Sequence, residues 1–261
     1  MRRFARIAQV RALALMLIPL LVSSSVSGCA ETATTPGSRK VTVFAAASLR
    51  QSFTEIGERF QAVNPAAHVE FSFAGSADLL AQLTQGAAAD VFAPADVTTM
   101  DTAAQANLLA DPPVIIASNT LTIAVAAGNP KNIASLADLT RPGLAVVVCA
   151  PQVPCGSAAA KVQQAAGVRL DPVSEESQVS DVLQKVVSGQ ADAGLVYVTD
   201  ALGAGDRVTG VAFPEADTAV NVYPIAVLRQ SRDLDLARRF VDFVAGADGQ
   251  RSLSAAGFAK P

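Results

Sequence analysis

The sequence predicts an α/β protein in which short buried strands alternate with amphipathic helices. Three segments carry this prediction, because each joins an apolar strand, a turn of small residues and a helix; they start near residues 41, 69 and 144. Hydrophobic residues make up 51% of the chain and charged residues 16%, which is typical of a globular protein and not of a disordered one. The net charge of −3 argues against nucleic acid as a partner.

Residues 1–28 are predicted to be a signal peptide and not part of the fold. Four arginines precede an apolar stretch at 12–22, which is too short for a comfortable membrane span. The sequence VSGC that ends at Cys29 resembles the lipobox of bacterial lipoproteins, which implies that Cys29 is lipidated and becomes the new N-terminus. Ordinary signal cleavage is the alternative, and both place the mature chain outside the cytoplasm. Residues 29–39 are polar and are predicted to be a tether.

The first strand–turn–helix segment reads VTVFAAASL at 41–49. The strand is apolar, and the helix after it repeats Leu49, Phe53, Ile56 and Phe60 on one face. Ser48 stands at the expected N-cap. Because the first N–H groups of a helix lack internal partners and lie at the positive end of its dipole, this turn is a candidate anion site without a cationic side chain. The alternative is that Ser48 only caps the helix.

The second segment repeats the arrangement with Ser76. An alternating strand at 69–73 precedes Ala-Gly-Ser and a helix at 77–83 that Gly86 closes. The same N-cap alternative applies, but two such turns at the carboxyl ends of parallel strands favour a ligand site. A strand at 90–96 and a helix at 98–108 follow, and Asp90 and Asp96 are expected to be caps and turn formers and not a metal pair.

A long β-prone run at 114–127 is interrupted by Ser-Asn-Thr and fits a crossing between two lobes. A short capped helix at 135–139 and a buried strand at 144–148 come next, followed by the third turn and a helix at 157–166 that Gly167 closes. The turn contains Gly, Ser and Lys but lacks phosphate-loop spacing, which argues against a nucleotide site.

Cys149 and Cys155 flank this third turn. A disulfide is the preferred interpretation for an even pair in an oxidising compartment. Two free thiols are the alternative, because five intervening residues with two prolines can hold the Cα atoms apart. Zinc is disfavoured, since the only histidine is the distant His68.

The last third of the chain contains a helix at 180–188, a strand at 193–197 and a β-prone run at 221–229. Tyr197 ends the strand, either as a core or rim tyrosine or as a hydroxyl at a site. The run at 221–229 is predicted to return to the first lobe, onto which a helix at 234–244 packs.

Together, these landmarks resemble the extracytoplasmic molybdate-binding proteins of ABC transporters, over residues 40–261. The matching segments, in order, are VFAAASL at 43–49, FAGS at 73–76, ADVF at 89–92, PCG at 154–156, GLVY at 194–197 and YPIAV at 223–227. The resemblance implies a two-lobed, periplasmic-binding-protein-like (type II) α/β fold. Each lobe would be a mixed, mostly parallel sheet flanked by helices, with the ligand cleft between the lobes. Lobe I would comprise 40–118 and 222–261, and lobe II 119–221.

The resemblance also implies a set of oxyanion-binding residues. Ser48 and Ser76 would supply hydroxyl and backbone N–H groups, Cys155 and Val179 would supply backbone N–H groups, and Tyr197 would supply its hydroxyl. Cys155 departs from the alanine usual in the family. This change leaves the N–H in place but can reshape the loop.

Several further expectations come from the same resemblance. The ligand is molybdate or tungstate, so molybdenum is present only within the oxyanion, and there is no cofactor or catalytic residue. The partner is the transmembrane permease of an ABC transporter. The protein is expected to be a monomer, anchored by lipid on Cys29 to the outer face of the cell membrane.

Three rival functions remain to be weighed. An enzyme is disfavoured, because no base or nucleophile motif surrounds Ser48 or Ser76 and His68 lies on a strand. A binding protein of the same fold for sulfate or another small anion is the main alternative; an organic acid would normally want an arginine clamp, which the five positions do not provide. The strand–turn–helix segments argue against a structural or adhesive protein. A pocket of donors only also favours a fully ionised oxyanion over phosphate, whose proton leaves polar groups unmatched at about 1–3 kcal/mol each.

Overall fold

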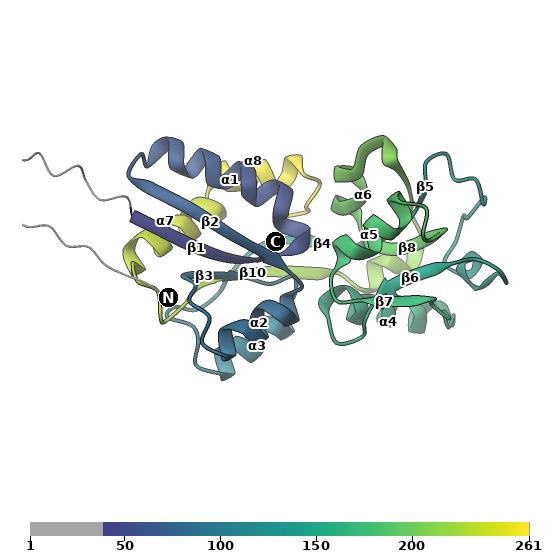
Figure 1. Ribbon diagram of the computed structural model, residues 1–261, viewed down its shortest axis with the longest axis horizontal. Coiled ribbons are helices and arrows are strands. Elements are labelled where there is room, and N and C mark those ends of the chain that lie inside the picture. Colours follow the sequence, from purple (N-terminus) through teal and green to yellow (C-terminus); the bar gives the residue numbers. More distant parts are fainter. Residues whose placement is uncertain (1–38, 261) are drawn as a thin grey trace, which may run out of the picture. The chain divides into compact units, whose positions relative to one another are not determined.

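The computed structural model describes residues 39–260, which form two five-stranded sheets flanked by helices (Figure 1). The predicted signal peptide, Cys29 and nearly all of the tether lie outside the described residues. The first sheet has the strand order β2 (Ala67–Ala74), β1 (Arg39–Ala46), β3 (Val91–Ala93), β10 (Asn221–Val227) and β4 (Val114–Asn119). The second has the order β7 (Ser174–Glu176), β6 (Val146–Cys149), β8 (Ala193–Tyr197), β5 (Leu121–Ala126) and β9 (Val208–Val211).

Both sheets are mixed, as predicted. In the first sheet β1 pairs in parallel with β2 and β3, whereas β10 runs antiparallel to β3 and β4. In the second sheet β6 pairs in parallel with β7 and β8, whereas β5 runs antiparallel to β8 and β9. The antiparallel pairings therefore all involve the strands nearest the two passages of the chain between the sheets.

Helices cover both faces of the first sheet (Figure 1). One face carries α1 (Arg50–Val63), α7 (Leu234–Ala245) and α8 (Ala247–Ala255), and the other carries α2 (Ser76–Thr84) and α3 (Val97–Gln105). Phe53, Phe60 and Phe240 are buried in the first of these layers, and Leu79 and Met100 in the second. The predicted apolar face of the first helix is confirmed, because its four repeating residues are all buried.

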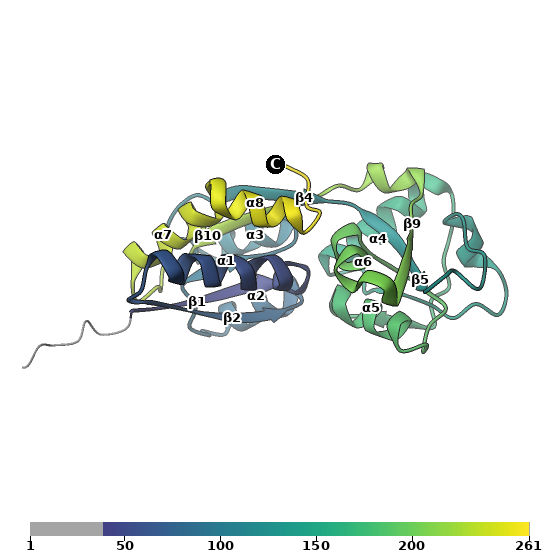
Figure 2. The same cartoon turned by 90° about the horizontal axis from the view of Figure 1, so that it is seen from above.

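The second sheet packs against α4 (Pro154–Ala166), α5 (Val179–Val187) and α6 (Val198–Ala204), which Figure 2 shows around β5 and β9. Four 3₁₀ turns complete the described chain: η1 (Ala47–Leu49), η2 (Ala137–Thr140), η3 (Gly205–Arg207) and η4 (Pro214–Thr218). The predicted helix at 135–139 is thus the 3₁₀ turn η2. Ser135, which precedes the turn, and Asp138 inside it each accept the other's backbone N–H. No helix of residues 39–260 is long and apolar enough to cross a membrane.

The run at 114–127, predicted to cross between two lobes, forms two strands. β4 ends at Asn119 in the first sheet, and β5 begins at Leu121 in the second, so only Thr120 separates them. β10 brings the chain back and pairs with β4, with Asn221 opposite Asn119. The two passages between the sheets therefore lie hydrogen-bonded side by side.

The structure corrects three predicted helix starts. Ser48 lies inside η1, and Leu49 is the N-cap of α1; Ser76 is the first residue of α2, and Gly75 is its N-cap. Neither serine hydroxyl caps a helix, because each has a partner elsewhere in the fold. The helix expected from residue 157 begins at Pro154, since proline fits the first helical position, where no N–H is needed.

The two aspartates around β3 have the structural roles predicted for them. Asp96 caps α3 by accepting the Thr99 N–H at 2.9 Å. Asp90 accepts the backbone N–H groups of Thr42 at 2.7 Å and Arg232 at 3.0 Å, which ties the start of β3 to its neighbours.

Candidate functional site

The five residues predicted to bind an oxyanion line a single pocket. Its walls combine the turns after β1 and β2 of the first sheet with the starts of α4 and α5 and the end of β8 of the second. The cavity volume is about 20 Å³, which has room for only one or two atoms the size of a water molecule. Alanine and glycine form much of the wall, and within residues 39–260 no Lys, Arg, His, Asp or Glu lines it. The site therefore suits a small ligand bound without a charged side chain.

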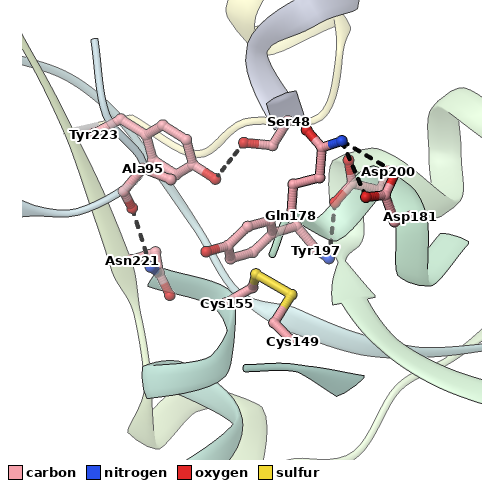
Figure 3. Close-up of a disulfide and its surroundings, with 10 residues drawn as sticks. All are labelled: Ser48, Ala95, Cys149, Cys155, Gln178, Asp181, Tyr197, Asp200, Asn221 and Tyr223. Carbon is pink, nitrogen blue, oxygen red and sulfur yellow. Dashed lines mark hydrogen bonds between the residues drawn. A yellow bond between two sulfur atoms is a disulfide. The ribbon is translucent and has the colours of Figure 1, made fainter. Parts of the chain in front are cut away.

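The first-sheet side of the pocket contributes two serine hydroxyls. Ser76 is only 2% exposed, and its Oγ accepts the backbone N–H of Ala95 at 3.0 Å. Because Ser76 is the acceptor in that bond, its own proton is left to donate to another group. The Ser48 Oγ lies 3.1 Å from the hydroxyl oxygen of Tyr223 on β10 (Figure 3). Each serine is thus held by a partner outside its own turn.

The second-sheet side contributes backbone N–H groups at two helix starts. α4 begins with Pro154, which has no N–H, so Cys155 carries the first N–H of that helix. Val179 is the first residue of α5. Neither the Cys155 N–H nor the Val179 N–H has an acceptor among residues 39–260. Helix starts present such free N–H groups at the positive end of the dipole, which favours an anion.

Two glycines let the backbone close around the pocket. A Cβ at Gly75 would lie 2.3 Å from the carbonyl oxygen of Ser177, so the turn before α2 packs directly on the segment before α5. A Cβ at Gly156 would lie 1.8 Å from the carbonyl oxygen of Ala150. A side chain at either position would push apart the walls that carry the donors.

Cys149 and Cys155 form a disulfide in the structure, with their Cα atoms 5.6 Å apart (Figure 3). The preferred interpretation of this pair is therefore confirmed. The bond joins the end of β6 to the first turn of α4 across the loop 150–154. It fixes the start of the helix whose N–H faces the pocket.

The Tyr197 hydroxyl is the one buried side-chain polar atom of residues 39–260 that has no hydrogen-bond partner. Tyr197 ends β8, is 1% exposed and lines the pocket. Burial raises the pKa of Tyr197 well above its ordinary value, so the hydroxyl keeps its proton and can donate. A buried hydroxyl without a partner costs about 1–3 kcal/mol, and an acceptor bound in the pocket would remove that cost.

Comparison with known proteins agrees with this geometry. Residues 41–259 match the family described as bacterial extracellular solute-binding proteins. The chain belongs to this family. It is 60% identical over 227 residues to the molybdate-binding protein ModA of Mycobacterium bovis, a match that covers 87% of both chains.

Two solved structures show how widely the fold of this solute-binding protein is shared. The periplasmic molybdate-binding protein of Azotobacter vinelandii has a TM-score of 0.74 at 20% identity and covers 85% of this chain and 99% of its own. The sulfate-binding protein SubI of Mycobacterium tuberculosis has a TM-score of 0.73 at 23% identity and covers 85% and 87%. At these identities the likeness shows the fold alone, with its two mixed sheets.

The structure of this solute-binding protein adds two residues that the sequence analysis missed. Asp200, the third residue of α6, accepts the Tyr197 N–H at 3.0 Å, and burial raises the pKa of Asp200 to about 7. Tyr223 contacts Ser48, although 175 positions separate them. The position of Asp200 at the start of a helix is visible in the sequence, but the distant partner of Ser48 is not.

Proposed function

We propose that this protein captures molybdate, and tungstate with it, outside the cytoplasmic membrane and delivers the anion to the permease of an ABC transporter. The observation that carries the proposal is the pocket itself. It gathers the two serine hydroxyls, the free N–H groups of Cys155 and Val179 and the unpartnered Tyr197 hydroxyl, with no charged side chain in the walls formed by residues 39–260. The 60% identity to a molybdate-binding protein supports the same ligand.

Because the pocket offers hydrogen-bond donors and few acceptors, it should favour a ligand that carries no proton. Molybdate, tungstate and sulfate carry no proton at neutral pH, so every oxygen can accept. Phosphate keeps a proton and would present a donor to a pocket of donors, at a cost of about 1–3 kcal/mol per unmatched group. Sulfate is fully ionised as well, so only the size of the cavity can make the pocket prefer molybdate to sulfate. A sulfate-binding protein of the same fold is therefore the second candidate function.

The remaining parts of the proposal concern organisation and location. We propose that residues 40–118 and 222–261 act as one lobe and residues 119–221 as the other. Each set carries one sheet with its helices, except that Asn119 and Asn221, at the ends of β4 and β10, belong to the first sheet. Lipid on Cys29 would hold the protein, as a monomer without a cofactor, at the outer face of the membrane. The site would act by binding and release alone.

Calorimetric titration of the chain that follows the signal peptide tests the ligand. We expect one-to-one binding of molybdate and tungstate, much weaker binding of sulfate and no heat with phosphate. A double replacement of Ser48 and Ser76 by Ala should abolish the tight binding. Ser52→Ala is the matched control, because Ser52 on α1 is as buried as Ser76 but bonds only to the Leu49 carbonyl oxygen. Sulfate binding as tight as molybdate would change the ligand, and no heat with any oxyanion would refute the proposal.

A further inference from the structure

Tyr223 has a side chain that the proposed donor set does not use. Its ring is fully buried and packs edge-on against Tyr197, at 6.1 Å between centroids, and against Phe258, at 5.3 Å. Within residues 39–260, its hydroxyl makes one hydrogen bond, to the Ser48 Oγ at 3.1 Å (Figure 3). The contact joins β10 to the turn after β1 directly beside the pocket.

The direction of this bond decides what Ser48 can do. A serine hydroxyl has one proton, so Ser48 can donate to a ligand only if Tyr223 is the donor between the two. A phenol is the better donor of such a pair, because it is the stronger acid, and burial raises the pKa of Tyr223 so that the proton stays in place. The favoured arrangement is therefore Tyr223 donating to Ser48, and Ser48 donating into the pocket.

We propose that Tyr223 is a positioning and specificity-determining residue of the oxyanion site: its hydroxyl donates to the Ser48 oxygen and so turns the Ser48 proton toward the ligand. The inference rests on the proposed function. Ser76 supports it, since the Ala95 N–H occupies the Ser76 oxygen in the same way. Tyr223 and the Ala95 N–H thus hold the two serines so that each serine proton can be donated to the ligand. Successive hydrogen bonds of this kind polarise and strengthen one another.

The arrangement predicts selectivity as well as affinity. While Tyr223 donates to the Ser48 oxygen, the Ser48 proton points toward the ligand, so a protonated oxyanion oxygen meets a donor there. Removing the Tyr223 hydroxyl lets the Ser48 proton turn away from the ligand, and Ser48 can then accept a hydrogen bond from hydrogen phosphate. The ratio of molybdate to phosphate affinity should fall, and a residue that merely packs the core has no reason to change that ratio.

A double-mutant cycle on the chain that follows the signal peptide tests the inference, with affinities for molybdate and phosphate measured by calorimetry. We expect Tyr223→Phe to weaken molybdate binding about 3- to 10-fold, as the loss of one hydrogen bond implies. We also expect it to lower the molybdate-to-phosphate ratio more than it lowers the molybdate affinity. In a Ser48→Ala background the same change should have less than a 2-fold effect, because Tyr223 acts through Ser48.

Phe258→Leu is the matched control. It disturbs the same aromatic stack without touching a hydroxyl, so it should lower Tm and leave the molybdate-to-phosphate ratio unchanged. Equal losses from Tyr223→Phe in both backgrounds, or no loss in either, would overturn the inference and leave the proposed function intact. Absence of molybdate binding by the wild-type protein would overturn both.

Discussion

The two sides of the pocket offer the same chemistry by different means. The first-sheet side uses the side-chain hydroxyls of Ser48 and Ser76, each held by a group from another element. The second-sheet side uses main-chain N–H groups at the starts of α4 and α5, whose side chains, Cys155 and Val179, play no direct part. A hydroxyl depends on the residue type, whereas a helix-start N–H is present with any residue except proline. Replacing a side chain by alanine should therefore weaken ligand binding on the first-sheet side and leave it nearly unchanged on the second-sheet side.

The largest effect on affinity is expected from Ser76→Ala. The change removes a hydrogen bond to a charged ligand and also leaves the buried Ala95 N–H without its acceptor. Hydrogen bonds to charged groups contribute about 1.5–3 kcal/mol, so molybdate affinity should fall about 10- to 150-fold. Calorimetry checks this, with Ser52→Ala expected to bind like the wild type. A loss smaller than 3-fold would show that the hydroxyl does not reach the ligand.

Val179 gives the sharpest test of the main-chain side. Val179→Ala keeps the N–H and should change molybdate affinity less than 2-fold. Val179→Pro removes the N–H at the first position of α5, where proline is tolerated, and Gln178 before it already has φ −151° and ψ 152°, which suit a residue that precedes proline. Relative to the alanine variant, we expect affinity to fall about 10-fold or more by calorimetry. Equal affinities of the two variants would exclude this N–H from the site.

Removing the disulfide should lower the stability of the protein but hardly change its affinity for molybdate. Replacing both Cys149 and Cys155 by Ala keeps the Cys155 main-chain N–H, which the first turn of α4 still positions. Opening so short a loop should lower the free energy of unfolding by about 2 kcal/mol and change molybdate affinity less than about 3-fold. Urea unfolding and calorimetry on the same preparation measure the two effects. A large affinity loss at unchanged stability would contradict this division.

Asp200→Asn should have the smallest effect on affinity at neutral pH and a clear effect on how stability depends on pH. Burial raises the pKa of Asp200 from 3.8 to about 7, so the stability this carboxyl lends is complete below pH 4 and is lost as pH rises through 7. The amide still accepts the Tyr197 N–H and does not ionise. Between pH 4 and 8 the wild type should lose about 4 kcal/mol relative to the variant, measured by urea unfolding. Parallel stability profiles would contradict the burial of a charge at this position.

The sequence predicted those parts of the fold that depend on local pattern. Buried runs such as 193–197 and the helix ends marked by Gly86 and Gly167, both at positive φ, lie where they were expected. The short strands β7 and β9 and the helices α6 and α8 were missed. Every residue of β7 and most of β9 are at least partly exposed, so these strands show no clear apolar pattern.

The sequence predicted five residues that line one pocket, but not the hydrogen-bond partners that hold the two serines. Local small-residue turns and the resemblance brought together five residues that line one pocket. The N-cap roles of Ser48 and Ser76 were wrong, because their partners, Tyr223 and Ala95, come from other elements. Such pairings depend on how the sheet is assembled, so they cannot be predicted from the spacing of residues along the chain.

The absence of Lys and Arg from the pocket walls formed by residues 39–260 has a consequence for how fast a ligand arrives. An acidic chain of net charge −3 repels a dianion, and no cationic cluster in those walls steers the anion inward. Added salt screens repulsion between like charges. The association rate should therefore rise with ionic strength, opposite to the behaviour of an electrostatically steered site, so that capture is fastest in salty surroundings.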